Sequence, residues 1–170
     1  MMDNSASKSV QLFQEGYRLY QQHQLEQALQ VWQQAVQCQE NKDLKSEAMM
    51  LYNVGVTLNG LEKFDQSIAC MSQALSVFKE IEDRNGEALT LHYMGVLYSW
   101  KSEPQAELDY YLQAVNSFHA LGDRRQEAHV RASIAMSYQG LNNLPLALEQ
   151  INSAIAIVQE HRTENNRVLS

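Results

Sequence analysis

Residues 83–100, DRNGEALTLHYMGVLYSW, decide the fold, because the same pattern returns forty residues away on either side. Residues 43–60 are DLKSEAMMLYNVGVTLNG and residues 123–140 are DRRQEAHVRASIAMSYQG. Each segment opens with Asp-x-x-x-Glu-Ala and carries apolar residues at helical spacing around a small residue at its thirteenth position. A period of this length indicates an array of repeated helical units.

Each unit is predicted to contain two helices joined by a short polar break. The first helix carries the small mid-helix residue, and the second carries its own apolar stripe. We expect a disordered segment at residues 1–8, a single domain at 9–161 and a polar tail at 162–170. The domain is expected to divide into four repeats, at about 9–42, 43–82, 83–122 and 123–161.

Glycines inside the first helices need an explanation, because glycine in a helix interior costs roughly 0.5–1 kcal/mol relative to alanine. Gly16, Gly55 and Gly95 occupy this place, with Ala135 in the last repeat. Close approach of the paired helix would offset the cost. We expect small residues of the second helix to face them: Ala28, Ala35, Ala74, Ala114, Ala147 and Ala154.

Composition excludes several classes of function. The formal charge is −7, which argues against nucleic acid and against a polybasic membrane patch. Apolar residues make up 45 %, but no run approaches the length of a membrane span. Cys38 and Cys70 follow no disulfide pattern, so buried free thiols are favoured over one disulfide. A cytoplasmic protein without membrane insertion is expected.

The pattern resembles the tetratricopeptide repeat family over about residues 9–161. The repeat here is 40 residues rather than the family's usual 34, as in its longer-repeat variety, and Ser67 and Glu107 replace a usual alanine. The resemblance implies an all-α fold, a right-handed α-solenoid of four antiparallel helix pairs. The residues that carry it are Leu12, Gly16, Ala28, Trp32, Ala35, Leu51, Val54, Gly55, Leu58, Met71, Ala74, Leu91, Met94, Gly95, Tyr98, Tyr111, Ala114, Ala135, Tyr138, Ala147, Ile151 and Ala154.

The resemblance also implies a binding surface, because the first helices of such repeats line a concave groove. Mapped onto this sequence, the groove is aromatic, apolar and amide-bearing, with almost no fixed charge. The alternative is that these side chains only fill space between helices. The expected partner-binding residues are Phe13, Tyr17, Tyr20, Tyr52, Asn53, Val56, Asn59, His92, Val96, Ser99, Trp100, Met136 and Gln139.

Nothing in the sequence assembles into a catalytic, cofactor or metal site. The five histidines lack the spacing of a helical metal pair, and no Gly-rich phosphate loop is present. His92 and His129 are expected to face the same groove, where a metal-binding or pH-sensing pair is the alternative to plain contact residues. We therefore predict a protein that is not an enzyme and needs no cofactor.

The last repeat is expected to leave an apolar strip uncovered. Leu148 and Ile155 correspond to Leu108 and Val115, which should pack on a following repeat. Self-association as a homodimer, or docking on a partner, would cover the strip. The alternative is that Val168 and Leu169 fold back over it.

These observations favour a scaffold or adaptor, such as an assembly factor, that holds a peptide or helix of another protein in its groove. Two alternatives stay open. The first is a regulatory receptor for a short signalling peptide, which would usually carry an output module. The second is a structural module that associates with itself.

Overall fold

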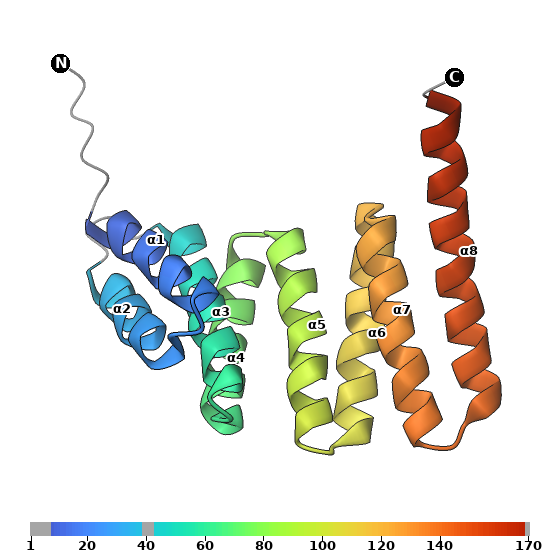
Figure 1. The fold of residues 1–170 in the computed structure, drawn as a ribbon, viewed down its shortest axis with the longest axis horizontal. Helices are drawn as coiled ribbons and strands as arrows, with labels where there is room; N and C mark the ends of the chain where they lie inside the picture. The colour runs from blue at the N-terminus through green and yellow to red at the C-terminus, as the bar shows by residue number, and fades with distance from the viewer. Residues whose placement is uncertain (1–7, 39–42, 169–170) are drawn as a thin grey trace. The chain divides into compact units, whose positions relative to one another are not determined.

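The computed structural model describes residues 8–38 and 43–168, and these ranges are helical apart from short turns, with no strand among them. The all-α class predicted from the sequence is confirmed (Figure 1). The helices are α1 Lys8–Gln21, α2 Leu25–Gln37, α3 Leu44–Gly60, α4 Phe64–Glu80, α5 Arg84–Trp100, α6 Pro104–Leu121, α7 Arg124–Gly140 and α8 Leu144–Val168. Most of the segment expected to be disordered, residues 1–7, lies outside the described residues.

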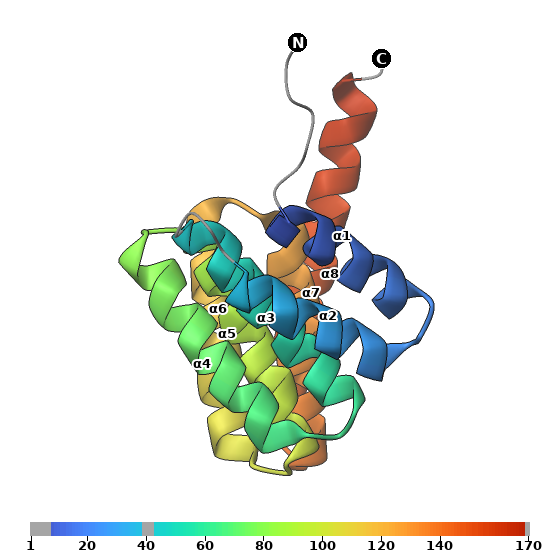
Figure 2. The ribbon, with the colours of Figure 1, turned by 90° about the vertical axis from the view of Figure 1, so that its left-hand side faces the viewer.

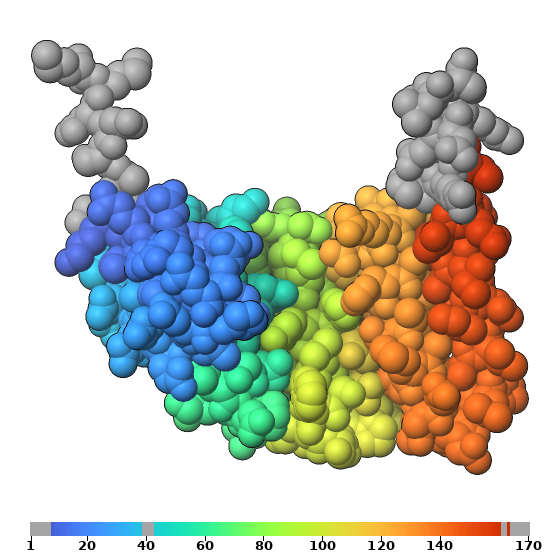
Figure 3. All heavy atoms as spheres, viewed as in Figure 1, coloured from blue at the N-terminus to red at the C-terminus, as the bar shows by residue number. Residues whose placement is uncertain are grey.

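The chain divides into two compact units, Met1–Asp83 with α1 to α4 and Arg84–Ser170 with α5 to α8. In unit 1, α1 packs on α2 and α3 packs on α4, and α2 also contacts α3. Figure 2 shows the α1 and α2 hairpin from the side. In unit 2, each helix packs on the next from α5 through α8. Figure 3 shows the atoms of α8 lying along those of α7.

The helix ends share one turn geometry. The residue two positions after the helix has a left-handed backbone at five of these ends, with φ between 56° and 59° at His23, Glu62, Glu82, Ser102 and Asn142. After α6 the left-handed residue is Gly122, one position beyond the helix, with φ 70°. The next residue donates its N–H back to the last helical turn, as Lys63 does to the Leu58 carbonyl at 2.9 Å. This is the Schellman arrangement, which satisfies carbonyls that a helix end leaves without partners.

Two of the three repeated aspartates cap the helices that follow them. The Asp43 carboxylate accepts the Lys45 backbone N–H at 3.2 Å and the Ser46 hydroxyl. Asp123 accepts the Gln126 backbone N–H at 3.0 Å. Asp83 lies 3.0 Å from Lys45 Nζ, an ion pair within unit 1. The periodic aspartates therefore fix helix starts as the sequence predicts at two sites.

The mid-helix glycines do face the paired helix, but the side chains opposite them are large. A Cβ on Gly16 would overlap the Trp32 indole, and one on Gly95 would overlap the Tyr111 ring. On Gly55 it would lie 2.8 Å from Met71 Cε. The atoms nearest to each glycine therefore belong to a large side chain rather than to the small residues expected from the sequence. Each glycine makes room for a bulky side chain sixteen residues later, which gives a tight helix pair with more apolar contact.

Helix α8 continues to Val168, so the expected polar tail from residue 162 is largely helical. Residues 146–168 contain neither Gly nor Pro, and nothing in their composition stops the helix. Within residues 8–38 and 43–168, every helix is too short or too polar to serve as a membrane span.

A buried carboxylate ties three helices of unit 2 together. Glu127 on α7 is 1 % exposed and lies 2.8 Å from Arg124, 3.0 Å from Arg131 and 3.1 Å from His119 on α6. Arg124 also reaches Glu160 on α8 at 2.8 Å. Burial alone would raise the pKa of Glu127, but the hydrogen bonds from His119, Arg131 and Arg124 outweigh it and lower the pKa.

Candidate functional site

The candidate site consists of residues on the first helices of the repeats, which are α1 and α3 in unit 1 and α5 and α7 in unit 2. In unit 1, α1 and α3 carry seven of the predicted contact residues, and none of the seven is fully buried. Tyr17 is exposed. Phe13 and Tyr20 instead pack against Trp32, with ring centroids 6.4 Å and 5.9 Å from the indole.

Packing gives Phe13 and Tyr20 a structural role as well as an exposed edge. The Trp32 indole N–H donates to the Phe13 carbonyl at 3.1 Å, so the buried ring has its polar group satisfied. On α3, Tyr52 packs on the core cluster of Ala48, Ala74 and Phe78. The space-filling alternative therefore applies to Phe13, Tyr20 and Tyr52, whereas Tyr17 is available to a partner.

The remaining unit 1 residues lie on α3. The Asn53 side chain donates to the Met49 carbonyl one turn earlier, at 2.9 Å, and stays partly exposed. Val56 and Asn59 are likewise half-buried. These side chains give α3 a mixed apolar and amide face without a charge, as the sequence predicts. No described feature assigns them a ligand.

In unit 2, α5 carries His92, Val96, Ser99 and Trp100, and α7 carries Met136 and Gln139. The side chains of Trp100 and Met136 are each 65 % exposed. Large apolar side chains that stay this accessible cost free energy in water, and they are the kind of residue that anchors protein interfaces. Trp100 and Met136 are the clearest contact candidates in unit 2.

His92 and His129 do meet, as predicted for neighbouring repeats. Their rings lie edge to face with centroids 5.2 Å apart, and His92 also packs on the Tyr111 ring at 5.7 Å. Burial, reinforced by His129, lowers the pKa of His92 to about 4. Its Nε2 is buried without a hydrogen-bond partner among the described residues. No group of three or more metal-ligating side chains occurs in the described part of the chain.

A pocket of about 500 Å³ opens where the end of α5, the start of α6 and the end of α7 meet. Ser99 and Met136, two of the predicted contact residues, line it together with Glu107. The Glu107 side chain is only 9 % exposed, and its Oε1 accepts a hydrogen bond from the Ser137 hydroxyl at 2.5 Å. The structure therefore brings a buried carboxylate to the edge of the predicted groove.

Sequence reasoning missed Glu107 as a site residue, although the signal was present. Glu107 stands where Ala28, Ser67 and Ala147 stand in the other repeats, and it counted only as a departure from the family pattern. A large ionisable residue at a position that is small in the other repeats is a reason to expect a local pocket.

Burial and the nearby Glu107 carboxylate raise the pKa of Tyr111 to about 12, and a hydrogen bond from Ser133 acts in the opposite direction.

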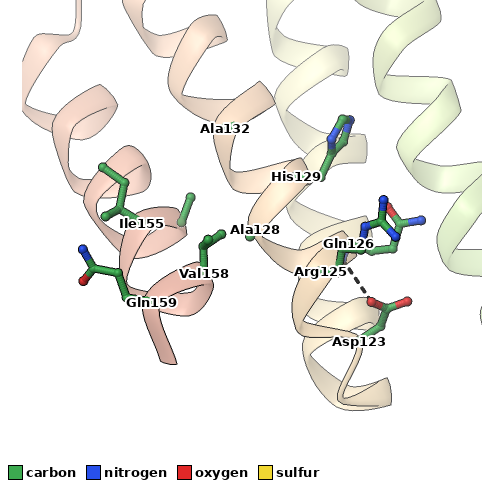
Figure 4. Close-up of a pocket in the computed structure, with 10 residues that line it drawn as sticks. Asp123, Arg125, Gln126, Ala128, His129, Ala132, Ile155, Val158 and Gln159 are labelled. Atoms are coloured by element: carbon green, nitrogen blue, oxygen red, sulfur yellow. Dashed lines mark hydrogen bonds between the residues drawn. The ribbon is translucent and has the colours of Figure 1, made fainter. Parts of the chain in front are cut away.

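The pair α7 and α8 forms a second candidate surface. A pocket of about 880 Å³ lies along the start of α7 and the second half of α8. Figure 4 shows Ile155 and Val158 on α8 beside Ala128 and Ala132 on α7. Polar side chains surround this apolar floor, among them Asp123, which is held by the Gln126 N–H.

The uncovered strip predicted on the last repeat is present among the described residues. Leu148 is 60 % exposed and Ile155 is 48 % exposed, whereas Leu108 and Val115 at the same repeat positions of α6 are 7 % and 3 % exposed under α7. The strip extends to Leu144 and Val158, which are also exposed. With Ile151 these residues follow 4–3 spacing, so they form one continuous stripe, named here the α8 stripe: Leu144, Leu148, Ile151, Ile155 and Val158.

Cys38 and Cys70 are free thiols, as expected, but both are half-buried rather than buried. Burial raises the pKa of the Cys70 thiol, which disfavours the reactive thiolate.

The comparisons with known proteins agree with this architecture. A family model described as "Tetratricopeptide repeat" matches residues 46–119, which run from α3 to α6. Over these residues the chain matches the tetratricopeptide repeat family. Its fold is an all-α helical repeat solenoid, and repeats of this family are generally protein-interaction modules without catalysis.

Solved structures resemble this chain over most of its length. BtubC from P. vanneervenii superposes with a TM-score of 0.85 at 15 % identity, covering 91 % of this chain and 64 % of BtubC. The TPR-like repeats of a putative kinesin light chain from Podosopora anserina give a TM-score of 0.76 at 13 % identity over 92 % of this chain and 78 % of that one. At this identity the likenesses establish the fold alone.

A sequence relative is the 43 kDa receptor-associated protein of the synapse from Tetronarce californica. It is 24 % identical over 111 residues, which are 65 % of this chain and 27 % of that protein. The chain thus spans about a quarter of the length of this curated relative.

Proposed function

We propose that this chain is a scaffold or adaptor that holds a peptide or helix of another protein against the faces of its first helices. The observation that carries the proposal is the accessibility of large side chains at the predicted contact positions, above all Trp100 and Met136 in unit 2 and Tyr17 in unit 1. Tetratricopeptide repeats are protein-interaction modules, which fits a role in binding rather than catalysis. A cytoplasmic location stays a prediction.

The chemistry of these faces supports a polypeptide ligand. Aromatic rings bury much area at little entropic cost, and side-chain amides such as those of Asn53 and Gln139 can pair with a peptide backbone. The near absence of charge on the predicted faces argues against a strongly ionic ligand over the whole surface. A regulatory receptor for a short signalling peptide would use the same faces and stays an alternative.

The test is an affinity capture from the native lysate with the wild type, Tyr17→Ala and Trp100→Ala. Tyr52 is left unchanged, because it packs on the core. We expect each variant to weaken capture of the same protein by about tenfold or more, as for an interface anchor. Leu112→Ala is the matched control, since Leu112 is an exposed apolar residue on a second helix. Capture that survives both changes would contradict the proposal.

A second candidate role, self-association, is favoured by the α8 stripe. Its residues repeat with 4–3 spacing. The residues along one flank of the stripe, Pro145, Asn152 and Gln159, carry no charge. Two copies could therefore pair without like-charge repulsion in spite of the net charge of −7. Sedimentation of the wild type beside Leu148→Glu at high micromolar concentration tests this role, and a monomeric wild type would rule it out.

A further inference from the structure

Glu107 occupies a repeat position at which the other three repeats have a small side chain. The corresponding residues in the other repeats are Ala28, Ser67 and Ala147. Ser67 is fully buried and donates its hydroxyl to the Gly55 carbonyl at 2.6 Å, so that position serves the contact between paired helices in unit 1. Glu107 reaches toward α7 instead, where its carboxyl group accepts a hydrogen bond from Ser137.

The charge of Glu107 is not compensated within the described part of the chain. Its Oε1 accepts a hydrogen bond from the Ser137 hydroxyl, which is a neutral donor. Glu127, on α7 of the same unit, shows what compensation looks like, with three basic side chains within 3.1 Å. Glu107 is 9 % exposed, so its carboxylate keeps little contact with water, and a cation beside it would stabilise its charge.

The pocket that Glu107 lines offers the other features that a cationic side chain needs. The hydroxyls of Ser99 and Ser133 lie on its wall with Met136 and Leu141, and no Lys, Arg or His lines it. Apolar walls can cover the methylene stem of a lysine or arginine while its charged end reaches the carboxylate. A volume of about 500 Å³ is within the ordinary range for a ligand pocket.

We infer that the pocket lined by Glu107, Ser99 and Met136 receives a lysine or arginine side chain from the bound segment of a partner protein. The inference rests on the proposed function and adds a specificity rule to it. The segment inserts one basic side chain at the junction of α5, α6 and α7, and its apolar residues contact Trp100 and Met136. The negative charge of Glu107 then gains the counter-charge that the chain itself does not supply.

The experiment is selection of binders from a random dodecapeptide phage library on the wild type, Glu107→Gln and Asp109→Asn. Asp109 is an exposed carboxylate on the same helix, so Asp109→Asn changes the net charge equally without touching the pocket. We expect wild type and Asp109→Asn to select peptides with Lys or Arg at one fixed position. Glu107→Gln should lose the preference at that position and keep the apolar positions.

Affinity measurements on one selected peptide then isolate the contact. Glu107→Gln and replacement of the peptide's basic residue by norleucine should each weaken binding by about tenfold or more, and the double change should cost little beyond either one. Glu107→Ala, which restores the residue of the first and fourth repeats, is the second variant if Glu107→Gln folds poorly.

The outcomes separate this inference from the proposed function. Selected peptides without a fixed basic residue, or an unchanged preference in both Glu107 variants, would contradict the inference and leave peptide binding standing. A wild type that selects no peptide contradicts both.

Discussion

Helices α6 and α8 occupy the same place in consecutive repeats, yet the outer apolar face of α6 is buried and that of α8 is exposed. Leu108 and Val115 of α6 are buried under α7, whereas Leu148 and Ile155 of α8 are exposed among the described residues. The residue types are alike, so the difference comes from the neighbour. A repeat encodes an apolar face that the next helix is meant to cover, and burial of that face is a property of the array rather than of the helix.

The largest predicted effect is a difference in the free energy of unfolding between matched substitutions on these two faces. Leu108→Ala is expected to lower the free energy of unfolding by about 2–5 kcal/mol, because it removes a buried side chain and leaves a cavity. Leu148→Ala at the matching position of α8 should change it by no more than about 0.5 kcal/mol, because the side chain is already in water. Urea unfolding of both variants measures the contrast, and equal costs would show that the α8 stripe is covered in solution.

The pair α5 and α6 should also differ from the pair α7 and α8 in its response to acid. His92 on α5 corresponds to Ala132 on α7, and burial and His129 hold the pKa of His92 at about 4. The unfolded chain takes up this proton near its ordinary value of 6.5, so the folded state binds fewer protons between those values. Stability is therefore complete above pH 6.5 and falls as the pH drops to about 4.

The loss from His92 should reach up to about 3 kcal/mol at the acid end of this window. Urea unfolding at several pH values measures it, with His92→Gln as the variant that removes the titration while keeping a side chain of similar size. His129 and Tyr111 face His92, and both are unchanged in this variant. A pH slope that is the same in wild type and His92→Gln would contradict the prediction. Glu127, whose pKa is lowered from 4.5, adds its own loss below about pH 4.5 equally in both proteins.

A smaller effect on stability is expected when the mid-helix glycine of α5 is replaced by the alanine that α7 has at the same position. Gly95→Ala places a methyl group against the Tyr111 ring and should cost about 1–3 kcal/mol through overpacking. Ala135 tolerates its methyl group in the last repeat, where Ile151 is the corresponding residue sixteen positions later.

The double variant Gly95→Ala/Tyr111→Ile copies the pair found in α7 and α8, and it should recover part of the loss. Thermal unfolding monitored by circular dichroism compares the single and double variants. No recovery would mean that the cost of Gly95→Ala does not arise at Tyr111.

Much of the fold could be predicted from spacing alone. The recurring Asp43 and Asp123 mark helix starts, and the polar breaks mark turns, because capping and helix termination are local chemistry. Helix α8 runs on into the predicted polar tail, since a polar stretch without Gly or Pro does not stop a helix that has already begun.

The candidate site was less accessible to sequence reasoning. Period and register placed Tyr17, Trp100 and Met136 on the first helices, where the structure leaves them exposed. Phe13 and Tyr20 have the same helical spacing, but only the structure shows that both pack on Trp32. Their roles as partner contacts stay predictions. Glu107 shows the reverse case, since its departure from the repeat was visible and its pocket was not.

The sequence by itself determined the period, the class of the fold and the positions of caps and turns. These depend on interactions within about one helical turn, which recur wherever the residues recur. Only the tertiary structure decided which bulky side chain each glycine faces, which apolar face is covered and which carboxylate lacks a cation. Those outcomes depend on which side chains of other helices lie nearby, and no single repeat contains that information.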